Sequence, residues 1–248
     1  MTQSSDSSNK SYLQGEISSQ QNLSYLTTVD YLLVRQIFDT EQLVQTIVGI
    51  TARVKFGIFN NLNQQICFAY EESNCFERFC CGSNRTFIIH IVNNSNQEII
   101  RIERNRKFCT GICFCFANSC DCCTEEAFVE SPPGTYIGKI RQKASCCRTQ
   151  FNLINESNEK ILSIISDYCI CNGPCYCCCD NKFTIIGYDD HTEIGAIHKK
   201  YAGFIHEAFT DAELFTITFP QDLDKRMKAI GLAALFLINI MHFTQQNR

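Results

Sequence analysis

The sequence contains no tryptophan, and only 4 prolines and 12 glycines among its 248 residues. These low numbers exclude collagen-like and proline-rich low-complexity proteins. The chain also lacks an excess of positive charge, because Lys and Arg total 22, Asp and Glu total 26, and the net charge is −4. Without a basic field a chain is poorly suited to bind the phosphates of nucleic acids, so we predict no nucleic-acid partner.

The N-terminal residues 1–22 lack the basic start and the apolar run of a secretory signal peptide. They are rich in Ser, Gln and Asn, which predicts a disordered tail, followed by one folded domain over 23–243. We therefore expect the protein to lie in the reducing cytosol. Its 18 cysteines are then mostly thiols, lipid-acceptor sites or metal ligands rather than disulfides.

Most of the folded chain has the pattern of β-strands. Residues 31–37 form the first predicted strand, and four later stretches read as strand, polar turn and strand. Asn and Asp residues favour such turns because they tolerate positive φ and bond to the local backbone. The four predicted hairpins are 55–59 with 65–70, 87–92 with 98–103, 150–154 with 160–165, and 183–187 with 193–197.

The hairpins are spaced as if a unit had been duplicated. The turn at Asn61 maps onto the turn at Asn155, and the turn at Asn94 maps onto the turn at Asp189, at an offset of about 95 residues. Many antiparallel strands in a duplicated unit favour a closed barrel, because closure removes exposed strand edges. The fold class is therefore mainly β, as a closed antiparallel barrel.

The C-terminus breaks the strand pattern with a helix predicted at about 223–243. Its segment from Ala229 to Phe243 is apolar on all sides except for Asn239 and His242. Such a helix is buried either in protein or in lipid. At roughly 22 Å this segment is short for a membrane of roughly 30 Å, which favours a helix threaded through the barrel. The residues expected to be shielded are Leu232, Leu235, Phe236 and Ile240.

Two clusters hold most of the cysteines, one over 109–123 and one over 169–179. Zinc binding, burial of thiols as small apolar groups, and S-acylation of a surface loop are three competing interpretations. Phe114 and Phe116 lie within the first cluster, which favours acylation there, and two or more acyl chains would anchor the protein. The predicted lipidation sites are Cys113, Cys115, Cys120, Cys122 and Cys123.

An acidic segment, 210–224, precedes the helix. Asp211, Glu213, Asp222 and Asp224 offer oxygen ligands for a weak Ca²⁺ site with a Kd on the order of 10⁻⁴–10⁻³ M. The same segment also reads as a strand over 215–219 followed by aspartates that cap the helix. The spacing alone favours neither interpretation.

Several motifs resemble the phospholipid scramblase family over about residues 25 to 243. They are Cys80-Cys-Gly82 with Arg85, Cys120-Asp-Cys-Cys123, Ser131-Pro-Pro-Gly-Thr-Tyr-Ile-Gly138, Gly195-Ala-Ile-His-Lys-Lys-Tyr-Ala-Gly203, and Glu207–Ala229 with the apolar run after it. The resemblance implies a tubby-like barrel of about twelve strands around a central C-terminal helix. It also implies Ca²⁺-dependent, ATP-independent movement of phospholipids between leaflets, by a palmitoylated protein at the cytosolic face of the plasma membrane.

The resemblance also implies site residues. The family's calcium segment falls on Asp211, Glu213, Phe215, Ile217, Phe219 and Asp222, with Glu213 where Asp is usual. Its acylated cysteines match Cys120, Cys122 and Cys123, while Cys113 and Cys115 lie in a local insertion.

Two functions compete on this basis. One is phospholipid scrambling, in which no covalent bond changes, so the protein is not expected to be an enzyme. The other is an acyl-anchored module at the membrane surface that binds lipids or proteins, or associates with itself, without transport. Burial of the C-terminal helix favours the module, whereas exposure of the helix to lipid favours transport.

Overall fold

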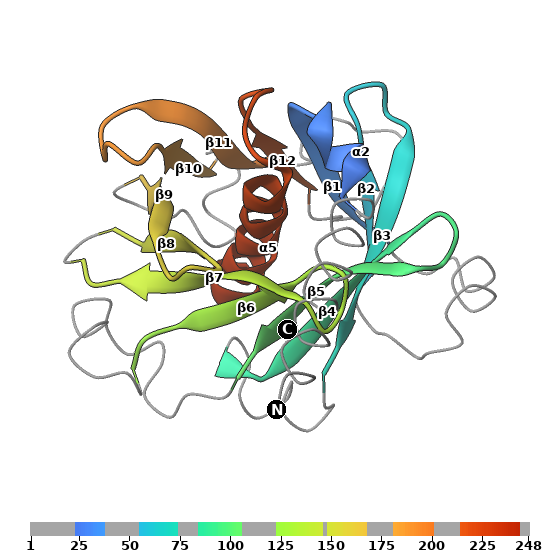
Figure 1. The fold of residues 1–248 in the computed structure, drawn as a ribbon, viewed down its shortest axis with the longest axis horizontal. Helices are drawn as coiled ribbons and strands as arrows, with labels where there is room; N and C mark the ends of the chain where they lie inside the picture. The colour runs from blue at the N-terminus through green and yellow to red at the C-terminus, as the bar shows by residue number, and fades with distance from the viewer. Residues whose placement is uncertain are drawn as a thin grey trace, which may run out of the picture.

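The computed structural model describes residues 23–37, 55–73, 84–105, 123–145, 148–167, 181–200 and 214–243. Twelve strands form a closed barrel in which each strand pairs with its sequence neighbours and β1 pairs with β12 (Figure 1). The strands are β1 Tyr31–Ile37, β2 Lys55–Phe59, β3 Gln65–Glu72, β4 Phe87–Asn93, β5 Glu98–Arg104, β6 Glu126–Glu130, β7 Tyr136–Lys143, β8 Gln150–Asn155, β9 Lys160–Ser166, β10 Asn181–Ile186, β11 Glu193–Lys200 and β12 Leu214–Thr218. The helices are α2 Ser24–Thr27 and α5 Lys225–His242.

Hydrogen bonds made by asparagine residues stabilise the hairpin turns. In the β2–β3 turn the amide of Asn63 donates to the carbonyl of Asn60 at 3.0 Å, and the Asn60 side-chain oxygen accepts from the amides of Leu62 and Gln64. Asn63 has a φ of 57°, a left-handed conformation that asparagine tolerates. The same conformation recurs in the next hairpins at Asn96, Asn158 and Asp190.

A bulge accompanies each of these four turns. The register of the two paired strands shifts between the last two residue pairs before the turn. A type I turn followed by a left-handed residue and a bulge is a common way to close a hairpin. All four predicted hairpins, and the first strand at 31–37, are therefore confirmed. The sequence did not predict the hairpin of β6 and β7, or the short helix α2.

The two ends of the barrel differ. The short-turn end carries the connections 60–64, 94–97, 131–135, 156–159 and 187–192, and the loop 219–224 that leads into α5. The long-connection end carries 38–54, 73–86, 105–125, 144–149, 167–180 and 201–213. In an antiparallel barrel with sequential strands, alternate connections must emerge at the same end. The N-terminus of α5 lies at the short-turn end, where Arg226 donates to Glu156 at 2.5 Å.

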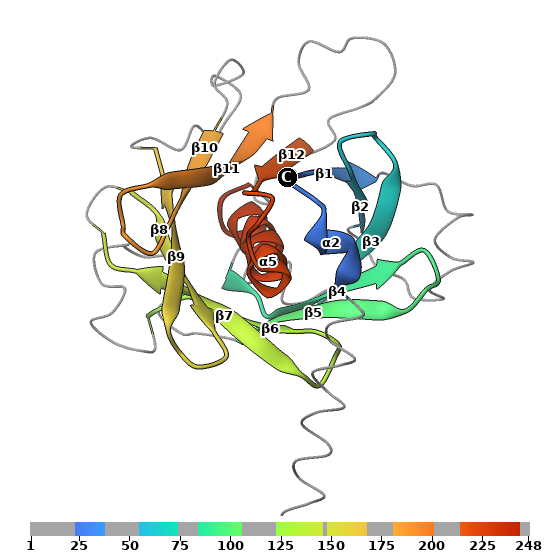
Figure 2. The same ribbon diagram turned by 45° about the horizontal axis from the view of Figure 1, so that its top comes forward.

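The helix α5 fills the interior of the barrel, with α2 beside its first turns (Figure 2). Every residue from Met227 to Ile240 is buried, including Leu232 and Leu235 at 0% exposure, Phe236 at 1% and Ile240 at 4%. This confirms the predicted barrel around a central helix. Asp224 caps the helix by accepting from the amide of Arg226 at 2.8 Å. Among the described residues, we find no helix with the length and apolar character needed to span a bilayer.

Close approach of the helix to the wall requires glycine in β7. A Cβ atom added to Gly138 would lie 2.3 Å from the carbonyl oxygen of Ile154 and 2.5 Å from Cδ1 of Ile230. Both distances are shorter than real carbon contacts. The glycine in the Ser131–Gly138 motif therefore has a packing role, because it lets α5 lie against β7 and β8.

Candidate functional site

The calcium segment is divided by strand β12. Phe215 and Ile217 lie in β12 with fully buried side chains, and the strand pairs with β1 on one edge and β11 on the other. Phe219 follows the strand with 6% exposure, and Asp222 is exposed in the loop before α5. Asp211 and Glu213 lie outside the described residues.

This strand sets the spacing within the segment. The first and last residues of β12, Leu214 and Thr218, are about 13 Å apart at the rise of a strand. Glu213 precedes this strand and Asp222 follows it, whereas Ca²⁺ binds oxygens at about 2.3–2.6 Å. Of the six residues, the described ones therefore lie within β12 or after it, while Asp211 and Glu213 lie outside the described residues, so the calcium site stays a prediction. Within the described part of the chain, no group of three or more His, Cys, Asp or Glu side chains is placed to hold a metal.

A lysine beside Asp222 occupies the mouth of the barrel. Lys228 is 0% exposed, and its ammonium donates to the carbonyls of Leu26 at 3.2 Å, Thr27 at 3.3 Å and Gln221 at 3.0 Å. Burial lowers the pKa of Lys228, while the charges of Asp30, Asp222 and Asp224 act in the opposite direction. The sequence signal was a lysine at the start of an apolar helix, but its role as the tie between α2 and α5 required the fold.

Most cysteines belong, by their place in the sequence, to the long connections. Seventeen of the 18 cysteines lie in four connections, namely those from β3 to β4, from β5 to β6, from β7 to β8 and from β9 to β10. The remaining one, Cys67, is buried in β3. Of the predicted lipidation sites, Cys123 is half-buried just before β6. Cys113, Cys115, Cys120 and Cys122 lie outside the described residues. All five nonetheless belong to one connection, 105–125, at one end of the barrel.

Polar groups line the barrel interior at this same end. Arg85 makes two hydrogen bonds to the carboxylate of Glu71, at 2.7 and 2.8 Å, and Arg104 donates to Glu125 at 2.6 Å. None of these four side chains is more than 2% exposed. Further buried polar side chains at this end are Gln142, Thr149, Ser166, Asn181 and Lys199.

The C-terminal turn of α5 reaches this polar layer. The Nε2 atom of His242 lies 3.3 Å from the hydroxyl of Thr149, and burial lowers the pKa of His242 to about 4. The Lys199 ammonium lies 3.9 Å from the centre of the Phe243 ring, a cation–π contact. The interior is thus apolar around most of α5 and polar where the cysteine-bearing connections begin.

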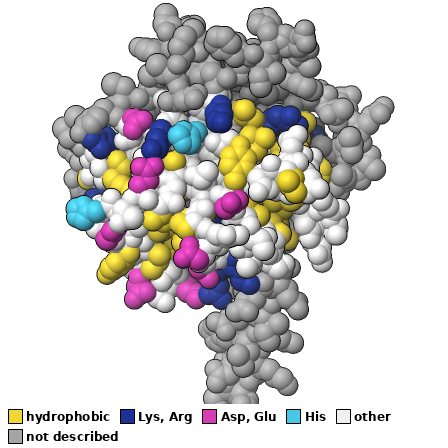
Figure 3. Space-filling model, turned by 90° about the horizontal axis from the view of Figure 1, so that it is seen from above, with side chains coloured by type: hydrophobic (Ala, Val, Ile, Leu, Met, Phe, Trp, Pro, Cys, Tyr) yellow, Lys and Arg dark blue, Asp and Glu magenta, His cyan; other side chains and the backbone are white. Residues whose placement is uncertain are grey.

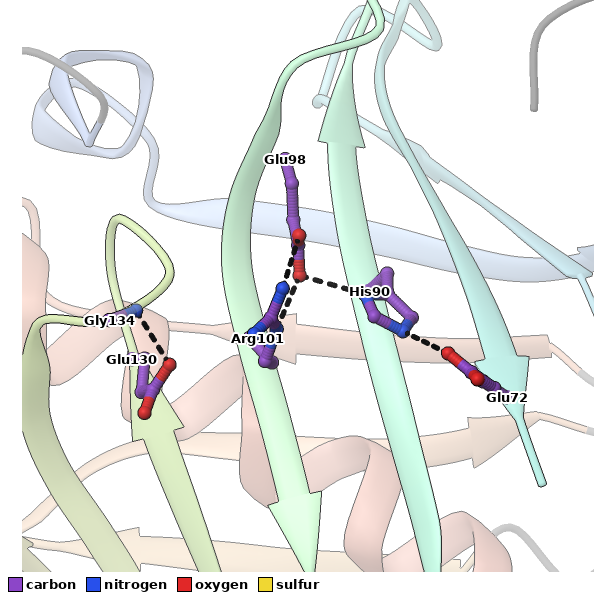
Figure 4. A network of polar contacts seen from close by, with 6 residues as sticks. All are labelled: Glu72, His90, Glu98, Arg101, Glu130 and Gly134. Carbon is purple, nitrogen blue, oxygen red and sulfur yellow. Dashed lines mark hydrogen bonds and ion pairs between the residues drawn. The ribbon is translucent and has the colours of Figure 1, made fainter.

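An outer-wall network crosses β3, β4 and β5 (Figure 4). The two ring nitrogens of His90 lie 2.7 Å from Glu98 and 3.0 Å from Glu72, and Arg101 makes two hydrogen bonds to Glu98. Burial acts to raise the pKa of Glu98, but the hydrogen bonds from Arg101 and His90 outweigh it and the pKa is lowered. Tyr70 stacks on the His90 ring at 4.9 Å. This arrangement ties three strands together and offers no nucleophile.

Comparison with known proteins places the chain in a family. The family model described as Scramblase matches residues 10–245. The chain is 37% identical to Phospholipid scramblase 1 of Rattus norvegicus and 38% identical to Phospholipid scramblase 2 of Bos taurus, each over 89% of its length. These matches cover 62% of the rat protein, which is less than two thirds of it, and 71% of the bovine one. No solved structure matches the chain. The chain belongs to the Scramblase family.

Proposed function

We propose that this protein moves phospholipids between the two leaflets of a membrane, with Ca²⁺ and without ATP. The observation that carries the proposal is the match to proteins named phospholipid scramblases over 89% of the chain. A charged headgroup does not cross hydrocarbon unaided, so such a protein must offer it a polar route while the acyl tails stay in lipid. No covalent chemistry is required.

The route we propose lies outside the barrel interior. Residues Met227 to Ile240 of α5 occupy that interior and are buried from solvent, which favours a route elsewhere on the barrel. Transfer at the outer wall, or at a contact between copies of the chain, is consistent with this packing. Phospholipids are then the partners of the barrel surface and of the residues at its ends.

A second candidate function is an acyl-anchored module that binds lipids or proteins at a membrane surface without transporting lipid. The burial of α5 favours it, because a helix enclosed by strands is not itself a lipid-facing path. Both functions share the same anchor and the same fold. They differ only in whether phospholipids change leaflet.

The experiment that separates them is leaflet exchange of a fluorescent phospholipid in liposomes that contain the purified full chain, with and without Ca²⁺. Scrambling predicts exchange faster than in protein-free liposomes, and faster still with Ca²⁺. Attachment of the protein, measured by flotation of the same liposomes, must be present for the result to count. Full attachment with exchange at the protein-free rate would leave the module as the function.

We propose that palmitate on Cys113, Cys115, Cys120, Cys122 and Cys123 attaches the long-connection end to the cytosolic face of the plasma membrane. The support is the placement of all five in one connection beside Phe114 and Phe116. Each acyl chain contributes about 0.8 kcal/mol per buried CH₂, so two chains suffice for stable attachment. Hydroxylamine, which cleaves thioesters, should release the protein from cell membranes, as should replacing all five cysteines by Ser. Retention after both treatments contradicts the proposal.

We propose that Ca²⁺ acts through carboxylates on the two sides of β12, namely Asp211 and Glu213 before it and Asp222 after it. The charge of Asp222 acts to raise the pKa of Lys228. The Asp211→Ala and Asp222→Ala variants test the two sides separately, because position 211 precedes β12 and position 222 follows it. At a Kd of roughly 1 mM, 10 mM Ca²⁺ raises the free energy of unfolding by about 1.4 kcal/mol. If both variants keep the whole Ca²⁺-dependent increment in stability and exchange, the ion acts elsewhere.

A further inference from the structure

A groove opens between two hairpin turns at the short-turn end. It has a volume of about 620 Å³ and is lined by Glu159, Lys160, Ile161, Tyr188 and Asp190, which we call the Tyr188 groove. Glu159 and Lys160 come from the start of β9, and Tyr188 and Asp190 from the β10–β11 turn. No part of the mechanism above uses this groove.

Hydrogen bonds hold its carboxylates in place. The Lys160 ammonium lies 2.6 Å from both carboxylate oxygens of Asp190, and Asp190 also accepts from the hydroxyl of Ser163 at 3.2 Å. The Glu159 carboxylate accepts from the side-chain amide of Asn155 at 3.1 Å. The hydrogen bond from Lys160 lowers the pKa of Asp190, which agrees with a charged carboxylate in the groove. The groove is therefore largely preformed.

Tyr188 projects from this fixed turn with 76% of its surface exposed. Its neighbour Asp189 pins the turn by accepting from the amides of His191 and Thr192 and from the Thr192 hydroxyl. An aromatic face held beside two carboxylates attracts organic cations, above all quaternary ammonium groups. Ile161 adds an apolar surface for the methyl groups of such a cation.

The groove also offers a donor to an anion. An ammonium has three N–H donors, and Lys160 uses two of them on Asp190, which leaves one for a phosphate oxygen. Acidic, basic and hydrophobic side chains lie interspersed on the described part of the face seen from above, without a field of one sign (Figure 3). Selection must therefore come from local geometry, with a positive and a negative group of the ligand bound a few ångströms apart.

We propose that the Tyr188 groove binds a zwitterionic phosphocholine group, with the trimethylammonium on the Tyr188 ring between Glu159 and Asp190 and the phosphate on Lys160. This inference deepens the proposed function and rests on it for its biological ligand, a choline phospholipid. Asp190 accepts from the hydroxyl of Ser163 in β9. The groove lies at the end opposite to the proposed acyl anchor, so a headgroup reaches it when the barrel lies with its side on the bilayer.

The test is a calorimetric titration of the full chain with glycerophosphocholine, which carries the headgroup without the tails. Choline chloride and glycerol phosphate, each with half of the zwitterion, should bind more weakly. The Tyr188→Ala variant should lose about tenfold in affinity. The matched control is Tyr136→Ala, which removes a 38% exposed tyrosine at the start of β7 and should leave the affinity for glycerophosphocholine unchanged. A competition arm adds phosphatidylcholine vesicles, which should displace glycerophosphocholine if lipid is the source of the headgroup.

Three outcomes overturn the inference. They are no binding of glycerophosphocholine at millimolar concentration, unchanged affinity in Tyr188→Ala, and tighter binding of a lysine-rich peptide that competes for the groove. Each of these three outcomes can be observed whether or not the protein exchanges phospholipids between leaflets. Conversely, binding that depends on Tyr188 in a protein that exchanges no lipid supports the groove and contradicts only the transport function.

Discussion

The two ends of the barrel show how differently one topology can be used. At the short-turn end, asparagine-based turns close the hairpins within a few residues, and α2 and Lys228 close the mouth. At the long-connection end, buried ion pairs line the interior and 17 cysteines lie in the connections that emerge there. Local asparagine hydrogen bonds close the turns of the first end, and Lys228 ties α2 to α5 there. Buried pairs of arginine and glutamate stabilise the second end. The difference separates an end closed by short turns from an end that carries the proposed membrane anchor.

The largest loss of stability should follow a substitution in the apolar core of the barrel, between its two ends. Leu235→Asp places a charge at a position with 0% exposure and without a partner. Such a charge costs several kcal/mol, against a total stability of about 5–15 kcal/mol, so we expect the variant to be unfolded. Circular dichroism with urea titration measures this. Leu62→Asp, in a turn where Leu62 is 71% exposed, is the control that should fold normally. A stable Leu235→Asp barrel contradicts the buried helix.

Removing one ion pair at each end of the barrel tests the difference in stability between the two ends. Arg104→Met leaves Glu125 buried without its partner at the long-connection end, which should cost about 3–5 kcal/mol. Arg226→Met removes the half-exposed pair with Glu156 at the short-turn end, which should cost about 0–1 kcal/mol. Free energies of unfolding from urea titration give both values. Equal losses in the free energy of unfolding for the two variants would contradict the proposed difference between the ends.

A substitution in a hairpin turn should cause the next largest loss of stability. Asn158 has a φ of 62°, so Asn158→Val forces a β-branched residue into the left-handed region. We expect a loss of about 1–2 kcal/mol. Asn158→Gly is the control, because glycine adopts this conformation without strain and should stay within a few tenths of a kcal/mol of the wild type. Thermal unfolding distinguishes the two, and equal stability of the Val and Gly variants would contradict the turn assignment.

The smallest effect is a pH dependence at the long-connection end. The pKa of His242 is about 4 in the folded chain and about 6.5 when unfolded, so the unfolded state binds more protons between these values. Stability from His242 is therefore full above pH 6.5 and falls as the pH drops. Between pH 7.5 and 5.5 the loss should be about 1 kcal/mol. His242→Leu should remove this part of the pH dependence, and an unchanged difference between the two pH values speaks against it.

Hairpins could be predicted from sequence because their signals are local. Asn60 and Asn63, or Asn155 and Asn158, make the turn with their own side chains and neighbouring amides. The β6–β7 hairpin was missed because its turn, 131–135, uses Pro and Gly in place of that asparagine pattern. Helix α2 was missed because four residues do not form a stable helix alone, and the carbonyls at its end are bound by Lys228, 201 and 202 residues away.

The site was only partly readable from sequence. Alternation over 215–219 predicted the strand, and the structure confirms β12 there at Leu214–Thr218. The pairing of β12 with β1 and β11, which places its Phe215 and Ile217 inside the barrel wall, needed the fold. The common end of the cysteine-bearing connections also follows from topology. The lipidation and calcium sites themselves stay predictions.

The central claim is that α5 remains the core of a closed barrel while the protein acts on a membrane. The absence of tryptophan makes this measurable with Phe236→Trp, whose side chain replaces one with 1% exposure, in liposomes that contain lipids brominated along their acyl chains. Phe114→Trp, beside the proposed acyl anchor, serves as the positive control. We predict quenching at position 114 and none at position 236, at protein levels that give leaflet exchange. Quenching at position 236 would show that the helix meets lipid and would contradict the account.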